Sequence, residues 1–158
     1  MNDILRPEGA NPGGIRKLEF TPKYAVAGFP DITDCAIAED LTFKAGFRWY
    51  VIECIENTLS YDVEQNDTDN GLIYKVAIDG VLRGENAVLK KLLQNMAETN
   101  AFYLKPTDTL GEAFLVGYGS ETAKFSYKKK SGDGMAGLRS YSFKFYEEFT
   151  VSPPLYDL

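Results

Sequence analysis

Residues 47–96 constrain the fold most, because two long strand patterns, a turn signal and a helix pattern follow one another there. Apolar and polar side chains alternate over residues 59–64 and again over residues 72–79, a pattern typical of strands with one buried face. The Asn70-Gly71 pair between them is the strongest short-range signal for a two-residue type I′ turn. The sequence therefore predicts a long antiparallel hairpin.

The position of this turn sets the predicted register of the hairpin. A turn centred on Asn70-Gly71 places Val63 opposite Ile78 and Leu59 opposite Leu82, so that one side of the hairpin is apolar. The polar tip is a candidate assembly element, and its residues are Asn66, Asp67, Thr68, Asp69, Asn70 and Gly71.

A calcium-binding loop is the alternative for the same tip, since it is rich in aspartate and asparagine. An EF-hand loop needs a bidentate glutamate at its twelfth position. Counting from Asp67, the twelfth residue is Ile78, which is an expected buried strand position. A solvated hairpin tip is therefore favoured, and no metal site is predicted.

Beyond Gly84 the apolar period changes from 2 to 3.6, which predicts an amphipathic helix. Asn86 is placed to cap its N-terminus, and Asn100 to end it in the left-handed conformation. The polar face is too mixed for a membrane-surface helix. We expect the helix to pack against a sheet through one apolar stripe, made of Leu89, Leu92, Leu93 and Met96.

The remaining patterns are those of strands. Residues 47–55 are apolar on both faces, which predicts a central strand covered on either side. Residues 123–128 and 141–146 alternate cleanly and predict a second hairpin, whose glycine-rich connection at 131–137 we expect to be mobile. Further strands are expected just after Ile15, near Ala36, and at residues 41–43, 102–105 and 113–118.

The order of these elements predicts the fold class. It is α+β and mainly antiparallel β, as a β-sandwich or partly open barrel with one flanking α-helix. Residues 1–14 are expected to form a flexible N-terminal arm, residues 15–152 a single β-rich domain, and residues 153–158 a short C-terminal tail.

Histidine is absent from the 158 residues, and this narrows the possible chemistry. Without imidazole, the Ser-His-Asp triad, the Cys-His dyad and the usual ligation of zinc or haem are excluded. Cys35 and Cys54 have no metal-ligand spacing, so we expect buried free thiols. Glu53 and Glu56 are the carboxylates nearest to a glycosidase pair, but residues three apart on a strand point to opposite faces. No catalytic residue and no cofactor is therefore predicted.

Charge and hydropathy restrict the possible partners. A net charge of −6 argues against a phosphate-binding surface, so tight or sequence-specific nucleic-acid binding is not expected. No apolar run approaches the length of a membrane span and no signal peptide begins the sequence, so synthesis in the cytoplasm and no membrane partner are expected.

A basic run at the foot of the second hairpin consists of Lys128, Lys129 and Lys130. They either protect an edge strand from unwanted pairing or bind an acidic partner, and the first is favoured.

In the order of its elements the chain resembles phage and prophage tail proteins, and more loosely the tail-tube fold. The resemblance is carried by Gly13-Gly14-Ile15-Arg16-Lys17-Leu18 and by four segments, residues 59–82, 86–99, 108–117 and 140–149. It implies a non-enzymatic virion protein, a tail-tube or tail-associated subunit made in a bacterial host. It also implies partners: copies of the same chain in rings or tubes, hexameric if tail-tube-like, and other tail proteins.

An acidic chain would also suit a lumen through which DNA passes without binding, because like charges repel. The rival hypothesis is a small-ligand or carbohydrate-binding β-domain, or an enzyme that depends on carboxylates. Its cleft would be lined by Trp49, Tyr50, Tyr61 and Tyr74, since aromatic side chains suit sugars.

Overall fold

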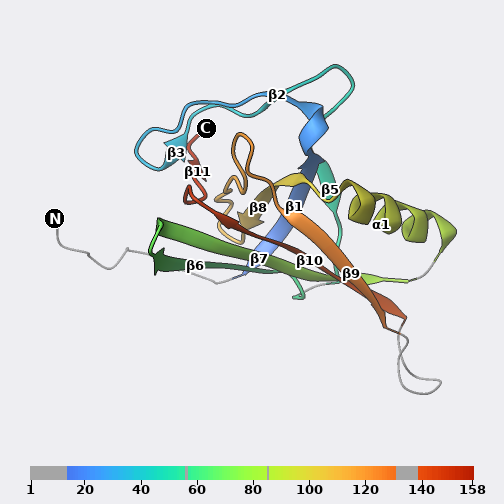
Figure 1. Cartoon of the computed structure of the whole chain (residues 1–158). Coiled ribbons are helices and arrows are strands. Elements are labelled where there is room, and N and C mark those ends of the chain that lie inside the picture. The colour runs from blue at the N-terminus through green and yellow to red at the C-terminus, as the bar shows by residue number, and fades with distance from the viewer. Residues whose placement is uncertain (1–13, 56, 85, 131–138) are drawn as a thin grey trace.

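Two antiparallel sheets form the body of the molecule in the computed structural model, which describes residues 14–55, 57–84, 86–130 and 139–158 (Figure 1). The three-stranded sheet has the order β5 (Tyr50–Ile52), β1 (Ile15–Pro22), β8 (Phe102–Asp108). The four-stranded sheet has the order β6 (Ser60–Thr68), β7 (Gly71–Arg83), β10 (Ser140–Phe149), β9 (Lys124–Lys130). Helix α1 (Ala87–Thr99) flanks them, and the described strands close no barrel. The predicted α+β, mainly antiparallel, sandwich-like class is confirmed.

Short elements cover the outer face of the three-stranded sheet, on the side away from β6–β10 (Figure 1). They are the 3-10 helix η1 (Lys23–Ala25) and the strands β2 (Val26–Gly28), β3 (Ala36–Ile37), β4 (Thr42–Phe43) and β11 (Leu155–Tyr156). β2 pairs with β4, and β11 pairs with β3 in parallel. Residues 153–158, the predicted tail, therefore contribute a strand to this layer.

Aromatic rings fill the space between the two sheets. Phe145 has no exposed surface and lies 4.9 Å from the ring of Phe125 and 5.7 Å from that of Phe102, between centroids. These rings meet because alternate residues of β9 and β10 point to the same side of the sheet. The second hairpin and its buried face are confirmed, whereas residues 131–137 lie outside the described part of the chain.

The first hairpin is also confirmed, but its predicted register is wrong by two residues. Val63 lies opposite Val76 and not Ile78, and Leu59, predicted to lie opposite Leu82, comes before the first paired residue of β6, Ser60. Side chains alternate with period 2, so a shift of two residues leaves the same side chains on the buried face.

The cause of the shift is the position of the glycine in the turn. Thr68 pairs with Gly71, so Asp69 and Asn70 are the two loop residues, and neither has a positive φ. Gly71 has a φ of +108°, directly after the loop. The turn is therefore not type I′; a loop followed by a glycine of positive φ resembles the hairpins that end in a glycine bulge.

The predicted central strand over residues 47–55 is wrong. Only Tyr50–Ile52 forms a strand, and β5 lies at the edge of its sheet, paired with β1. Tyr50 and Ile52 pack against the core, whereas Val51 on the other face is 51% exposed. An apolar run is typical of a strand buried on both faces, but it also occurs where one face is left partly uncovered.

The strand predicted at residues 113–118 is also absent, because only isolated bridges join it to β8, at Ala113 and Val116. Gly117 has a φ of +93°, which interrupts extended backbone at that point. The strand predicted at residues 102–105 is present as β8, which continues past Pro106 to Asp108 and lies at an edge of its sheet, where proline is tolerated.

Both ends of helix α1 are formed as predicted. The side chain of Asn86 accepts a hydrogen bond of 2.7 Å from the backbone N–H of Leu89, and Asn100 is left-handed with a φ of +45°. Leu93 and Met96 are buried, but Leu92 on the same stripe remains exposed. The apolar face of the helix is therefore only partly covered.

The N-terminal cap gives a first testable prediction. Replacing Asn86 with Ala removes the acceptor for the N–H of Leu89 and is expected to lower the free energy of unfolding by about 1 kcal/mol. Asn86→Asp keeps an acceptor oxygen and should change stability by less than about 0.5 kcal/mol. Urea denaturation followed by circular dichroism measures both variants; equal losses would contradict the capping role.

Candidate functional site

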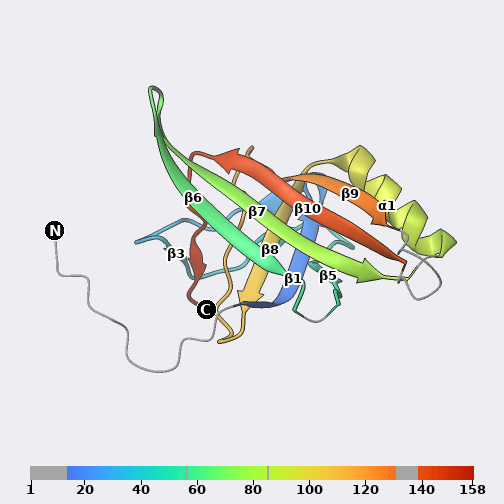
Figure 2. The ribbon, with the colours of Figure 1, turned by 90° about the horizontal axis from the view of Figure 1, so that it is seen from below.

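The tip of the first hairpin projects beyond the rest of the four-stranded sheet (Figure 2). β10 pairs with β7 only as far as Tyr74, so the first three residues of β7, Gly71–Ile73, extend past it. The Thr68 hydroxyl donates a 2.7 Å hydrogen bond to the Gly71 carbonyl and closes the turn. The six candidate residues 66–71 are thus brought together, and all but the half-buried Asn66 are exposed.

The same hairpin carries apolar side chains that the described chain leaves uncovered. Val63 is 42% exposed and Leu72 is 48% exposed, although both belong to the face that is buried further along the hairpin. The tip is therefore not wholly polar. Its underside offers an apolar surface next to the polar turn.

Both edges of the four-stranded sheet are free of further strands in the described residues. β9 forms one edge, as predicted for the lysine run, and it contains Lys124, Lys128, Lys129 and Lys130 without any acidic residue. β6 forms the other edge, and it contains Asp62, Glu64 and Asp67 without any basic residue. The two free edges of one sheet therefore carry opposite charge.

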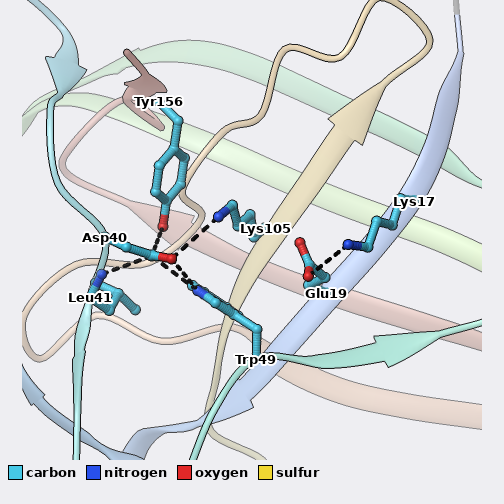
Figure 3. A network of polar contacts seen from close by, with 7 residues as sticks. All are labelled: Lys17, Glu19, Asp40, Leu41, Trp49, Lys105 and Tyr156. Atoms are coloured by element: carbon cyan, nitrogen blue, oxygen red, sulfur yellow. Dashed lines mark hydrogen bonds and ion pairs between the residues drawn. The ribbon is translucent and has the colours of Figure 1, made fainter. Parts of the chain in front are cut away.

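A second cluster lies between the short-strand layer and the outer face of the three-stranded sheet (Figure 3). The carboxylate of Asp40 accepts hydrogen bonds from Trp49 Nε1 at 3.0 Å, from Tyr156 Oη at 2.9 Å and from the backbone N–H of Leu41 at 2.8 Å. Lys105 Nζ lies 3.4 Å from the same carboxylate and 4.2 Å from the centroid of the Tyr156 ring.

The surroundings lower the pKa of Asp40 and raise the pKa of Tyr156, so both values lie far from 7. Burial opposes ionisation of Asp40, but the hydrogen bonds from Trp49, Leu41 and Tyr156 and the charge of Lys105 together lower its pKa. Burial, and then the charge of Asp40, raises the pKa of Tyr156. Asp40 is thus ionised and Tyr156 neutral at pH 7, and neither is poised to exchange protons there. The arrangement suits a clamp that fastens the C-terminal strand to β8.

No pattern in the sequence pointed to this clamp. Asp40 and Tyr156 are 116 residues apart, and each falls in a segment without periodicity. The sequence predicts Trp49 as part of the strand over residues 47–55 and as a ligand-binding aromatic, but not as a partner of Asp40.

A groove with a volume of about 510 Å³ lies between helix α1 and strand β5. We call it the α1–β5 groove; Tyr50, Val51, Ile52, Leu89, Leu92 and Met96 line its two sides, and Arg48 and Glu53 lie at its rim. Of the four aromatic residues of the predicted cleft, Trp49 and Tyr50 line this groove. Tyr61 instead packs against Phe114, with ring centroids 5.7 Å apart, and Tyr74 lies on β7. The predicted cleft is therefore only half assembled.

The other candidates from the sequence do not come together as a site. Glu56 lies outside the described residues, so the Glu53–Glu56 pair is not placed. Cys35 is exposed, contrary to the prediction of a buried thiol, whereas Cys54 is partly buried and burial raises its pKa to about 11. In the described part of the chain, no three histidine, cysteine or acidic side chains are grouped as metal ligands. No helix there has the length and hydropathy of a membrane span.

Comparison of the chain with protein families, curated proteins and solved structures found no match.

Proposed function

We propose that this chain is a non-enzymatic structural subunit of a phage or prophage tail, and that it assembles with copies of itself into rings or tubes. The observation that carries the proposal is the opposite charge of the two free edges of the four-stranded sheet. The phage context rests on the resemblance in element order described above.

Edge charge selects one kind of contact between copies. Two β6 edges repel each other through their carboxylates, and two β9 edges repel through their lysines. A β6 edge beside a β9 edge brings opposite charges together and satisfies backbone groups that are otherwise unpaired. The favoured contact is therefore head-to-tail, which gives rings when the rotation between copies closes.

Strand direction is compatible with such a contact. The four strands alternate in direction, so β6 and β9 of one copy are antiparallel. Copies related by rotation about an axis along the strands would then join through an antiparallel β9–β6 pair. One alignment of that pair places Glu64 beside Lys128 and Asn66 beside Ser126, with the charged pair on the outer face of the sheet.

Charge reversal tests this contact. Glu64→Lys and Lys128→Glu each place like charges at the joint and should lower the association constant about tenfold or more, measured by sedimentation velocity over a range of concentrations. The double variant Glu64→Lys with Lys128→Glu should associate again, and so should an equimolar mixture of the two single variants. The mixture is informative because positions 64 and 128 carry like charges within each single variant and opposite charges between the two variants.

Matched controls come from the outer faces of the inner strands. Lys144→Glu repeats the charge change of Lys128→Glu, and Glu148→Lys repeats that of Glu64→Lys; both positions lie on the inner strand β10, and neither variant should change association. Electron microscopy of the concentrated wild-type protein should show rings or tubes. A chain that stays monomeric at every concentration, or single edge variants that associate as the wild type does, would refute the proposal.

The hairpin tip gives an independent variant of this test. Neutralising Asp67 and Asp69 to Asn is expected to leave folding intact, because both side chains are exposed, and to change the sedimentation profile of the assembly. An unchanged profile would show that the tip is not part of the contact between copies. The two sheet edges would then remain as the candidate contact surfaces.

One observation favours a second candidate, a small-ligand binder. The α1–β5 groove is apolar, and its volume lies in the range of ligand pockets, which is roughly 300–1,000 Å³. A thermal-shift screen with glycans and apolar metabolites separates the two functions. A saturable shift with a protein that remains monomeric would favour the binder.

A further inference from the structure

A second hollow continues the α1–β5 groove towards the C-terminal end of helix α1, and its volume is about 240 Å³. The helix residues that line the two hollows run from Leu89 to Thr99, which corresponds to about 15 Å along the helix axis. The two hollows therefore form one elongated trough between α1 and β5, which we call the α1–β5 trough (Figure 1). They share Phe20, Tyr50, Leu92 and Met96.

The floor of the trough reaches the aromatic core of the molecule. Phe20, Phe125 and Phe143 line it and also belong to the buried cluster between the two sheets. On the walls, Val51 and Leu92 are exposed in the described chain, although both side chains are large and apolar. An apolar body that covers this surface would therefore be bound favourably.

One end of the trough carries a positive charge without an acidic partner. The guanidinium of Arg48 lies 5.7 Å from the centroid of the Tyr50 ring, and within the described residues it forms no ion pair. The second hollow contains the neighbouring Phe47, and its described lining has no charged side chain. A contact with an aromatic ring leaves the guanidinium N–H donors available for a carboxylate, which they bind as a bidentate fork.

The acidic residue of the rim, Glu53, lies at the other end of β5. An anionic group is therefore favoured beside Arg48 and not beside Glu53. A cationic group gains less beside Glu53, because Arg16 lines the hollow that adjoins it there. The charges at the two ends of the trough thus favour an anion over a cation and fix where the anion lies.

Between these two ends the lining offers no charged group. All lining residues of the groove other than Arg48 and Glu53 are apolar or aromatic. A glycan would leave most of its hydroxyl groups without hydrogen-bond partners on such a surface. The length of the trough instead suits an extended aliphatic chain.

We propose that the α1–β5 trough binds an amphiphile with one anionic head group and one aliphatic chain, such as the anion of a fatty acid. The carboxylate pairs with Arg48 at the rim, and the chain lies along Tyr50 and Ile52 over the aromatic floor. This ligand assignment rests on the second candidate function, the small-ligand binder, and is independent of the assembly of copies.

Titration of the wild type with dodecanoate tests the ligand class. Binding is followed by the emission of Trp49, which lines the groove and is the single tryptophan of the chain. Concentrations stay below those at which the amphiphile forms micelles. We expect saturable binding that is about tenfold tighter than for dodecanol or dodecyltrimethylammonium, which carry the same chain with a neutral or a cationic head.

Substitution of Arg48 tests the position of the head group. Arg48→Glu should weaken the binding of dodecanoate about tenfold or more and leave that of dodecanol unchanged. Arg48→Lys keeps the positive charge and should retain most of the affinity. Lys144→Glu makes the same charge change as Arg48→Glu on the outer face of β10, in the other sheet, and should change neither affinity.

Two variants of helix α1 test the position of the chain. Leu92→Asp places a charge in the apolar wall and should weaken the binding of dodecanoate and of dodecanol about tenfold or more. Val88→Asp makes a similar change one turn earlier, on a side chain that is exposed and does not line the trough, and should weaken neither. Circular dichroism checks that both variants remain folded.

The outcomes separate the ligand class from the ligand site. Equal affinity for the three amphiphiles, or an unchanged affinity in Arg48→Glu, would overturn the anionic class and leave the trough as a ligand site. Failure of all three to bind would overturn the proposal together with the ligand-binder candidate. A changed sedimentation profile of Leu92→Asp without ligand would show that the trough is a contact between copies, and this too would overturn the proposal.

Discussion

Phe145→Ala is expected to lower the free energy of unfolding by about 3–5 kcal/mol, the range typical of removing a buried aromatic ring. Phe145 has no exposed surface, and the rings of Phe20, Phe102, Phe125 and Phe143 all lie within 6.4 Å of its own, between centroids. These rings come from both sheets. The cavity would therefore open at the contact that holds the two layers together, where neither sheet can move inward freely.

The neighbouring residue supplies a matched control for this variant. Tyr146 lies on the other face of β10 and is 38% exposed, so Tyr146→Ala should cost no more than about 1 kcal/mol. Phe145→Leu keeps most of the apolar volume and should fall between the two. Guanidinium denaturation measures all three variants. Similar losses for Phe145→Ala and Tyr146→Ala would show that the aromatic cluster is not the main contact between the sheets.

The core was predictable where local pattern and long-range packing agree. Tyr141, Phe143 and Phe145 alternate with polar residues, so both the strand and its buried face follow from the sequence. Helix α1 was predictable at both ends because the Asn86 and Asn100 caps act on backbone groups within a few residues. In each case the physical cause is local.

Predictions failed where the outcome depended on a distant segment. The apolar run at residues 47–55 forms only the short edge strand β5, because its one strand partner in the described residues is β1, and no local pattern in the run records this. The hairpin register failed for a different reason. Asn70-Gly71 favours a type I′ turn, but Gly71 can also supply its positive φ just after a two-residue loop, and this places the turn one residue earlier.

The candidate surfaces were predictable in part. Lys128 and its neighbours were expected on an edge strand, and β9 is one. The acidic character of the opposite edge followed only once the sheet order placed β6 there. The Asp40 clamp was not predictable, because it joins a loop, an edge strand and the C-terminal strand, none of which has a pattern that refers to the others.

Asp40→Asn is expected to lower the free energy of unfolding by about 1–2 kcal/mol at pH 7. Hydrogen bonds to charged groups contribute roughly 1.5–3 kcal/mol, but the Asp40 side chain is 38% exposed and solvent reduces that contribution. If the amide oxygen keeps the place of Oδ1, where Tyr156 and Leu41 donate, the NH₂ group takes the place of Oδ2 and faces the donors of Lys105 and Trp49. Asp31→Asn, an exposed position in the same loop region, is the control and should change stability by less than about 0.5 kcal/mol.

The pH dependence of this effect distinguishes the clamp from a simple packing contact. The surrounding donors lower the pKa of Asp40 in the folded state below its ordinary value of 3.8. The stabilisation is therefore complete well above pH 3.8 and is lost as the pH falls through the lower pKa of the folded protein. The difference in unfolding free energy between the wild type and Asp40→Asn should accordingly be constant near neutral pH and shrink below pH 3.8. Urea denaturation followed by Trp49 emission measures this difference. If it persists undiminished at the lowest pH at which both proteins fold, the charge of Asp40 is not what fastens Tyr156, and the C-terminal strand must be held by packing instead.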